Sequence, residues 1–404
     1  MFQSLQAPPC NRRPALRPLR AALAGLAAAF LAACQPMGTG SSASGPATGQ
    51  MIDPGQPIPV ALLVPTGSGN ADLEWLGRSL ANAAKMAAAD AQGANIDLRI
   101  YSTGSDASTA AARTGEAIRA GAKIVIGPLH AEAANAAGNV ARGSNVNLLS
   151  FSNNSEVAGG NVFTLGTGFG NVADRLVSYG VRQGKRRYMV VAESDVAGQL
   201  GARAIEAAIS RAGAMNMGKV SHEVSRAGVD SIVPSVAAAA QAGKIDAVFV
   251  TANQDAVLPY LADKLHAAGI TPNQAQLMGL TRFDEPAMRL SLPGLQEGIF
   301  ALPDTALRQQ FEARYQAAYG ERPHALAGLG YDGVSAIAAL ARTGRKDALT
   351  STALTRNAGF AGVNGVFRLK GDGTTERGLA VATVRGGKVV ILDPAPRSFG
   401  GFGS

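Results

Sequence analysis

Polar residues that could bind a ligand follow two apolar runs in the stretch from 121 to 154. His130, Ala131 and Glu132 come after the run at 123–126 and a Gly-Pro turn. Ser152, Asn153 and Asn154 come after the run at 146–149. Short apolar runs bounded by turn residues are typical of strands that are covered on both faces of a parallel sheet. Because ligands bind beyond the carboxyl ends of such strands, we expect a binding site there.

The same residue types could support catalysis or metal binding, but their spacing does not indicate either. The four histidines, His130, His222, His266 and His324, fall on different expected elements and not at ligand-like spacings. A nucleophilic pair of Ser152 with His130 has no evident third group to orient the base. The Gly-x-Gly-x-x-Gly match at 328–333 lies inside a helical pattern rather than after a strand, so it predicts close helix packing. We therefore expect no enzyme, no metal and no cofactor.

The single tryptophan, Trp75, lies near the start of the first expected helix, just beyond a strand-end loop. It could pack in the core. It could also form an apolar wall at the mouth of a cleft, since aromatic side chains commonly line concave sites.

The N-terminus resembles a lipoprotein signal. Residues 1–33 hold four arginines and no acid, and an apolar stretch at 21–33 is too short to span a bilayer stably. Leu31-Ala-Ala-Cys34 resembles the bacterial lipobox, in which the chain is cut before a cysteine that is then lipidated. The alternative is a plain signal peptide with an incidental cysteine. Residues 34–56 are rich in Gly, Ser, Pro and Thr and are expected to form a flexible tether.

Cleavage before Cys34 would change the apparent chemistry of the chain. Cys34 would be the one remaining cysteine, which excludes an intrachain disulfide. The 37 basic residues would fall to 33 against 29 acidic ones, so the formal charge of +8 would fall to +4. Because no Lys/Arg run stands out in the remainder, a nucleic-acid partner is not expected. Gln35 after the cysteine agrees with sorting to the outer membrane.

At 404 residues the chain is too long for one ordinary core and fits two α/β domains. Strands and helices alternate regularly from Pro57, in one set that ends near 162–166 and a second that ends near 298–303. Such an order requires right-handed crossovers and parallel sheets. Helices are then expected at 305–319, 325–342 and 347–356, and short strands near 365–369, 379–384 and 388–392.

The order of several short motifs resembles the type 1 periplasmic binding fold, and most nearly its leucine/isoleucine/valine-binding family. The motifs extend from Pro57 to Asp393 and are VALLVPTGSG, Trp75-Leu-Gly, KIVIGPLH, NLLSF, RYMVVAESDVAGQLGA, DAVFVTANQD, LMGLTRFDEP, Gly330-Tyr-Asp-Gly and GVNGVFRLKGDG.

This resemblance implies an α/β fold of two Rossmann-like lobes with parallel sheets and a ligand cleft between them. Three crossovers would lie near 166–170, 303–304 and 360–365. The first lobe would contain 57–168 and 304–360, and the second 169–303 and 361–393. Residues 394–404 would form a disordered tail.

In family members that bind amino acids, hydroxyls after the Gly-Pro-like turn hold the carboxylate, and an acid pairs with the ammonium. Here His130 and Ala131 follow the turn. Ala197 replaces a second-lobe aromatic residue, and Thr281 with Arg282 replace the acid. A buried ammonium without its carboxylate costs roughly several kcal/mol, so a free branched-chain amino acid is not expected as ligand. The expected cleft residues are Trp75, His130, Ala131, Ser152, Asn153, Asn154, Ala197, Asn253, Thr281, Arg282 and Tyr331.

An altered cleft behind a lipobox resembles the lipoprotein activators of penicillin-binding proteins, which dock on a peptidoglycan synthase. The sequence thus predicts a non-catalytic envelope lipoprotein, in the periplasm and anchored to the outer membrane, whose partner is such a synthase. The alternative is the solute-binding protein of an ABC transporter for amino acids or another small polar or anionic ligand. Its partner would be the permease.

Overall fold

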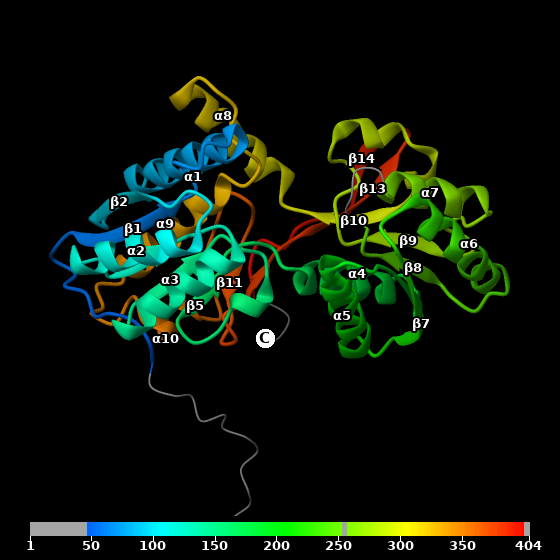
Figure 1. Cartoon of the computed structure of the whole chain (residues 1–404), viewed down its shortest axis with the longest axis horizontal. Coiled ribbons are helices and arrows are strands. Elements are labelled where there is room, and N and C mark those ends of the chain that lie inside the picture. The colour runs from blue at the N-terminus through cyan, green and yellow to red at the C-terminus, as the bar shows by residue number, and fades with distance from the viewer. Residues whose placement is uncertain (1–46, 253–256, 400–404) are drawn as a thin grey trace, which may run out of the picture. The chain divides into compact units, whose positions relative to one another are not determined.

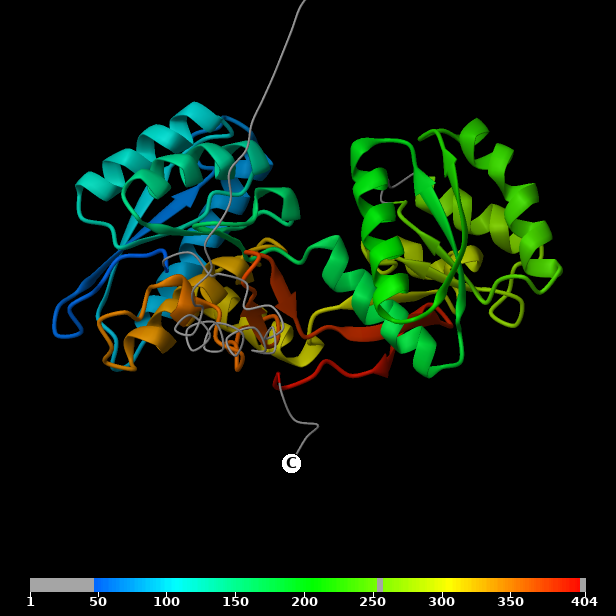
Figure 2. The same cartoon turned by 90° about the horizontal axis from the view of Figure 1, so that it is seen from below.

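The structure, a computed structural model, describes residues 47–252 and 257–399. They form two α/β lobes, and each lobe contains a sheet with helices on both faces (Figure 1 and Figure 2). Within these residues no helix is both long and apolar enough to cross a membrane.

The first lobe is built on a five-stranded parallel sheet with the order β2-β1-β3-β4-β5. Helices α1 and α9 cover one face of the sheet, and α2 and α3 cover the other. The bounds are β1 (Ile58–Val64), α1 (Ala71–Ala89), β2 (Ile96–Ser102), α2 (Ala107–Arg119), β3 (Ile124–Ile126), α3 (Ala131–Gly143), β4 (Asn147–Ser150), β5 (Val162–Thr164) and α9 (Gly328–Ala341).

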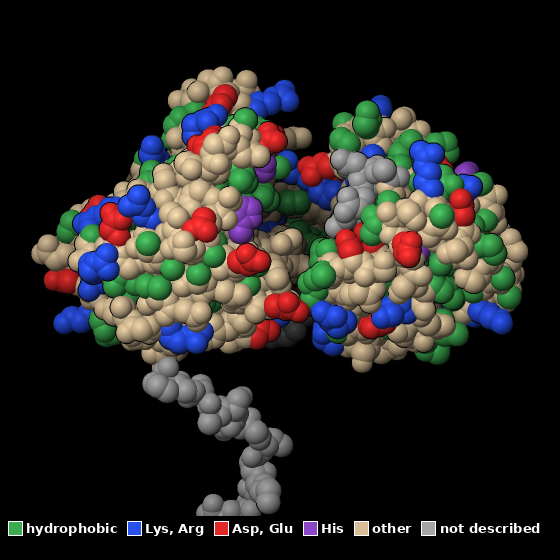
Figure 3. Space-filling view, in the orientation of Figure 1, with side chains coloured by type: hydrophobic (Ala, Val, Ile, Leu, Met, Phe, Trp, Pro, Cys, Tyr) green, Lys and Arg blue, Asp and Glu red, His purple; other side chains and the backbone are tan. Residues whose placement is uncertain are grey.

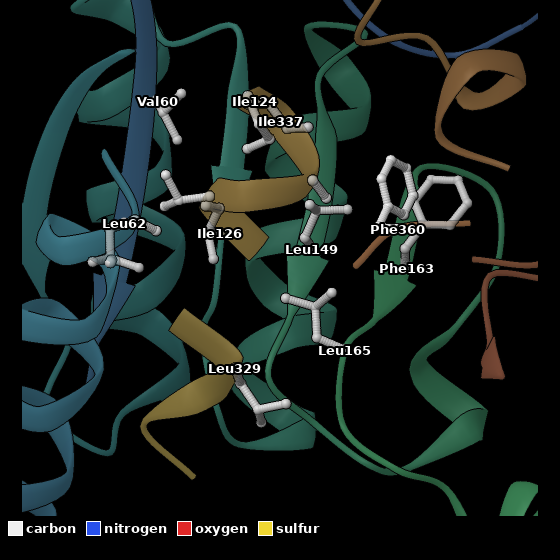
Figure 4. Close-up of a cluster of buried hydrophobic side chains, with 14 of the residues drawn as sticks. Val60, Leu62, Ile124, Ile126, Leu149, Phe163, Leu165, Leu329, Ile337 and Phe360 are labelled. Atoms are coloured by element: carbon white, nitrogen blue, oxygen red, sulfur yellow. The ribbon is translucent and has the colours of Figure 1, made fainter. Parts of the chain in front are cut away.

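Consecutive apolar residues in these strands follow from the two covered faces. Val60 and Leu62 point toward α1 and α9, where they pack with Ile126 and Ile337 (Figure 4). Leu63, one position along, packs instead with the α2 and α3 side. Because neither face meets water at the centre of the sheet, β1 and β3 carry apolar residues at every position, as their sequence predicted.

The glycines at 328–333 lie within α9, and Gly330 permits the close packing of this helix on α1. A Cβ on Gly330 would stand only 2.4 Å from the carbonyl oxygen of Leu80. The predicted helix–helix contact is therefore confirmed.

The second lobe has a seven-stranded sheet with the order β14-β13-β10-β9-β8-β6-β7. Its strands run parallel from β10 to β7, whereas β13 and β14 add an antiparallel edge. The bounds are α4 (Phe169–Arg182), β6 (Arg187–Glu193), α5 (Val196–Arg211), β7 (Met215–His222), α6 (Arg226–Gln241), β8 (Ala247–Val250), α7 (Val257–Ala267), β9 (Gln276–Gly279), β10 (Ile299–Leu302), β13 (Ala380–Arg385) and β14 (Lys388–Asp393). Short 3-10 turns lie at Ser155–Val157, Ala287–Ser291 and Pro293–Leu295.

After β10 the chain returns to the first lobe and stays there longer than we expected. Helices α8 (Thr305–Tyr319) and α10 (Ser351–Leu354) are followed by a hairpin of β11 (Phe367–Leu369) and β12 (Thr375–Arg377). Phe367 is fully buried in the first-lobe core beside Phe360, with 5.5 Å between the ring centroids. The segment from 361 to 377 thus packs with the first lobe, whereas we had assigned it to the second. Strand β12 was not expected, because Thr-Glu-Arg shows no apolar alternation.

Residues 48–52, here called the N-terminal strap, are fixed on the first lobe, although we expected a flexible tether over 34–56. The Thr48 hydroxyl donates to Asn147 Oδ1 at 2.7 Å, and its amide donates to Ser351 Oγ at 3.0 Å. Ile52 donates its amide to the Lys346 carbonyl at 2.8 Å. Cys34 and the expected signal lie outside the described residues.

The end of the chain also holds contacts where we expected disorder. The Arg368 guanidinium lies over the Phe399 ring, 4.8 Å from its centroid. Residues 400–404 lie outside the described part.

Candidate ligand pocket

Two loops at the carboxyl ends of β3 and β4 are joined by hydrogen bonds. Gly127 donates to the Leu149 carbonyl at 2.7 Å, and Phe151 donates to the Pro128 carbonyl at 3.0 Å. Only glycine suits position 127, because its φ is +85° and a Cβ there would lie 2.2 Å from the Leu63 carbonyl oxygen. The turn that identifies this stretch in the sequence therefore fixes where the polar residues after it stand.

Beyond these loops lies a pocket of about 410 Å³, here called the first-lobe pocket. Its volume is at the small end of the range for ligand sites of roughly 300–1,000 Å³. The lining residues come from first-lobe loops, from the starts of α3, α8 and α9, from β12 and from the connections between lobes. They are Leu129, His130, Ala131, Phe151, Ser152, Asn153, Asn154, Gly166, Thr167, Pro303, Arg308, Ala325, Leu326, Leu329, Asn364 and Arg377. Figure 3 shows histidine side chains beside the hollow, on the side of the first lobe.

Hydrogen-bonding groups gather on one wall of the first-lobe pocket. His130 is the N-cap of α3 but gives no side-chain cap, so the first amides of the helix remain open to an acceptor. Buried Ser152 accepts the Asn154 amide at 3.1 Å, and Asn154 in turn accepts the Glu156 amide at 2.9 Å. The exposed Asn153 lies between them. A helix N-terminus beside hydroxyl and amide groups suits an anionic or polar acceptor.

Two arginines complete the lining, and both have carboxylate partners. Arg308 donates to Glu312 at 2.8 Å and approaches Glu285 at 3.4 Å. Arg377 forms an ion pair with Asp332 at 2.7 Å, and both side chains are almost completely buried. The lining itself includes no Asp or Glu among the described residues.

The Arg377–Asp332 pair joins α9 to the last connection between the lobes. Asp332 also accepts the Val363 amide at 2.7 Å, and Arg377 lies over the Phe367 ring. Burial raises the pKa of the Asp332 carboxyl, and the adjacent guanidinium acts against that rise. The side chain of Asn171 in α4 exchanges two hydrogen bonds with the Arg377 backbone, at 2.9 Å and 3.2 Å. This arginine is therefore a structural link between first-lobe core and second-lobe helix.

The structure brings together five of the residues expected from the sequence. His130, Ala131, Ser152, Asn153 and Asn154 all line the first-lobe pocket. Ala197 does not line this pocket. It lines a larger, adjoining groove of about 1420 Å³, and Asn153, Asn154 and Arg377 line both.

Other expected residues lie elsewhere. Tyr331 donates its hydroxyl to Asp90 at 2.7 Å and packs edge-on against Phe311 in the first lobe. Trp75 packs edge-on against His324, with 4.9 Å between centroids. Neither of the expected aromatic residues lines the pocket or the groove.

Thr281 and Arg282, which stand at the expected position of the family's acid, make contacts within the second lobe. The Thr281 hydroxyl donates to the Ala252 carbonyl at 2.9 Å. Arg282 contacts Asp284 at 2.6 Å and Glu285 at 2.7 Å. Its charge is thereby matched locally, so our expectation that it attracts an anion loses its support. Asn253 lies outside the described residues.

Most of the lining was not identified from the sequence, because it comes from connections that are distant along the chain. Thr167 could have been found, since it follows the expected strand at 162–166. Pro303, Arg308 and Arg377 lie outside the quoted motifs, and Asn364 lies within GVNGVFRLKGDG without any sign of its place. Only the fold brings these four residues here. Among the described residues, no group of three or more His, Cys, Asp or Glu side chains could hold a metal ion.

Comparison with known proteins agrees with this architecture. The family described as "Periplasmic binding protein" matches residues 57–388. Comparison with curated proteins finds no match.

Three solved structures resemble the fold. A putative branched-chain amino acid ABC transporter protein from Rhodospirillum rubrum has a TM-score of 0.69 at 18% identity, over 83% of this chain and 100% of that one. A substrate-binding protein from Desulfitobacterium hafniense, in complex with Leu, has a TM-score of 0.61 at 18% identity, over 83% and 100%. A solute-binding protein from R. palustris, in complex with benzoate, has a TM-score of 0.55 at 19% identity, over 85% and 97%.

Proposed function

Because the chain belongs to the periplasmic binding protein family, we propose that it is the solute receptor of an ABC-type importer and works without catalysis. The observation that carries this proposal is the first-lobe pocket at the carboxyl ends of β3 and β4. It combines apolar walls with one polar wall, as small-molecule sites do. The structural neighbours include ABC transporter proteins in complex with Leu and with benzoate, which supports a small carboxylate-bearing ligand.

The ligand that suits this pocket has an acidic or polar end and an apolar body. The open N-terminus of α3 and the amide of Asn153 would hold the polar end. Leu129, Phe151 and Leu329 would surround the body. Among the described residues, the lining offers amides and hydroxyls but no Asp or Glu that could pair with an ammonium group, which favours an organic acid over its amino-acid counterpart.

A panel of matched ligand pairs tests this proposal. The mature chain would be titrated calorimetrically with leucine against 4-methylpentanoate, and with phenylalanine against 3-phenylpropanoate and benzoate. We expect the acids without an amine to bind more tightly. Asn153→Ala should then weaken binding by about tenfold or more, which is the loss of one hydrogen bond to a charged group. Asn273→Ala, at an exposed asparagine of the second lobe, is the matched control and should change nothing.

A second candidate is an activator of a penicillin-binding protein. The family resemblance supports it, since His130 and Ala131 would stand where hydroxyls hold an amino acid. The engagement of Arg282 by acids of its own lobe agrees with this. In this case the fold would contact a peptidoglycan synthase instead of delivering a solute to a permease. Lipidation at Cys34 belongs to this proposal and to the first alike, whereas attachment to the outer membrane belongs to the activator.

Deleting the gene distinguishes the two candidates. An importer receptor would leave β-lactam sensitivity unchanged and would abolish uptake of its solute. Increased β-lactam sensitivity, together with no binding by any member of the ligand panel, would exclude the receptor and favour the activator.

A further inference from the structure

The N-terminal strap fixes the point at which the preceding chain joins the first lobe. Besides the contacts of Thr48 and Ile52, the Gly49 amide donates to Asn145 Oδ1 at 3.1 Å, and the Gln50 side chain donates to the Ser144 carbonyl at 2.7 Å. Gly49 is buried with a φ of +113°, and a Cβ there would lie 2.4 Å from the Leu349 carbonyl oxygen. A bulkier residue would therefore be excluded from this position.

The strap lies at the end of the first lobe that is opposite to the pocket. In a parallel sheet with right-handed crossovers, the amino ends of the strands and the carboxyl ends of the helices share one edge. Ser144 and Asn145 directly follow α3, and Asn147 begins β4. The first-lobe pocket lies at the carboxyl ends of β3 and β4, which is the other edge.

The end of the first lobe that holds the strap is here called the basic pole. It carries five cations without a carboxylate partner among the described residues: Arg119, Lys123, Arg142, Arg342 and Lys346. Arg119 and Arg142 end α2 and α3, Arg342 follows α9, and Lys123 precedes β3. Figure 3 shows Lys and Arg side chains in blue at the outer end of the first lobe.

The acids near the basic pole leave most of this charge uncompensated. Asp97, Asp347 and Glu116 each bind an arginine other than the five, namely Arg99, Arg345 and Arg113. Asp53 is exposed in the segment after the strap and opposes the five cations. The basic pole thus keeps a net positive field toward solvent.

We propose that the basic pole lies against an anionic phospholipid surface. Charge complementarity is one reason, since juxtamembrane cations are attracted to acidic headgroups. The entry of the preceding chain at this same end is the other. Fourteen positions separate Cys34 from Thr48, so a lipidated chain could not move this end more than about 50 Å from its anchor. The first-lobe pocket would then face away from that membrane.

Vesicle sedimentation tests the proposal with the mature chain carrying Cys34→Ser, so that no acyl chain contributes. The vesicles would contain phosphatidylglycerol in phosphatidylcholine, or phosphatidylcholine alone, each at low and high salt. We expect binding to the acidic vesicles only, and its loss at high salt because exposed charges are screened. The double variant Arg119→Gln with Lys346→Gln should lower the partition coefficient about 25-fold, which is about fivefold for each cation removed.

The matched control is Arg186→Gln with Lys244→Gln, which removes two exposed cations from the second lobe. It should reduce binding much less than the first double variant. An equal loss in both would overturn the proposal, because net charge alone would then account for binding. Equal binding to neutral vesicles would overturn it as well. Thermal melting of each variant checks that the fold is intact, and ligand titration remains a separate measurement.

Discussion

The buried ion pair between Asp332 and Arg377 should make a large contribution to the integrity of the first lobe. The two side chains are 0% and 1% exposed and their charged atoms lie 2.7 Å apart. In Asp332→Asn the Val363 amide can keep its acceptor, but the guanidinium is left buried without its counter-charge. Removing one partner of such a pair costs about 3–5 kcal/mol. We expect Asp332→Asn to lower the free energy of unfolding by this amount.

A double-mutant cycle isolates the interaction. Arg377→Met should also destabilise the protein, because it leaves the Asp332 carboxyl buried and unpaired. Burial raises the pKa of this carboxyl. A raised pKa means that the folded state binds the proton more tightly, so stability of Arg377→Met should fall as pH increases above about 4. Adding Asp332→Asn should cost little further, because no unpaired charge then remains.

Urea unfolding followed by Trp75 fluorescence and by circular dichroism measures these effects, and coincident curves would justify a two-state treatment. The matched control is the pair of Arg345 with Asp347, which has the same 2.7 Å separation but exposed side chains. Its cycle should show no resolvable coupling. If the two cycles gave equal coupling, or if Asp332→Asn cost less than about 1 kcal/mol, the reasoning from burial would be wrong.

Three further predictions concern other parts of the molecule. Arg187 beside Asp246 lowers the pKa of this carboxyl to about 2, so Asp246→Asn should lower the free energy of unfolding by about 1–2 kcal/mol at neutral pH after allowance for exposure. In urea unfolding this difference from the wild type should vanish as pH falls through the range from about 4 to 2. Gly330→Ala should destabilise the protein by about 1–3 kcal/mol in urea unfolding, because its Cβ would meet the Leu80 carbonyl; a stabilised variant would contradict the helix contact. Burial lowers the pKa of His324, whose ring lies beside Trp75. In a pH titration, quenching of Trp75 fluorescence by the protonated ring should therefore have its midpoint below pH 6.5, and a higher midpoint would contradict the burial argument.

The sequence was sufficient for most of the strands and helices and for the family. Apolar runs such as 58–64 mark strands because both faces of the sheet are covered, and Asp106 marks the start of α2 by accepting the Thr109 amide. These features depend on neighbours along the chain, so they can be recognised without the fold. The hairpin of β11 and β12 was assigned to the wrong lobe because its place depends on residues distant along the chain. Phe367 is buried in the first-lobe core, and nothing near it in the sequence indicates that lobe.

The candidate site divides in the same way. His130 and Ser152 could be identified because they directly follow strands, and strand ends are where parallel sheets bind ligands. Arg308 and Arg377 reach the pocket from α8 and β12, which belong to the first lobe but follow second-lobe strands along the chain. Tyr331 was expected in the cleft on family resemblance, but its helix directs it to Asp90.

The sequence by itself determined the order of elements, the glycine positions and the residues at two strand ends, because local sterics and hydrophobic burial act on short segments. The tertiary structure alone decided which distant residues share a surface. The five cations of the basic pole show this most clearly. They are spread from Arg119 to Lys346 and form no run, yet helix ends and strand starts of a parallel sheet bring them to one edge.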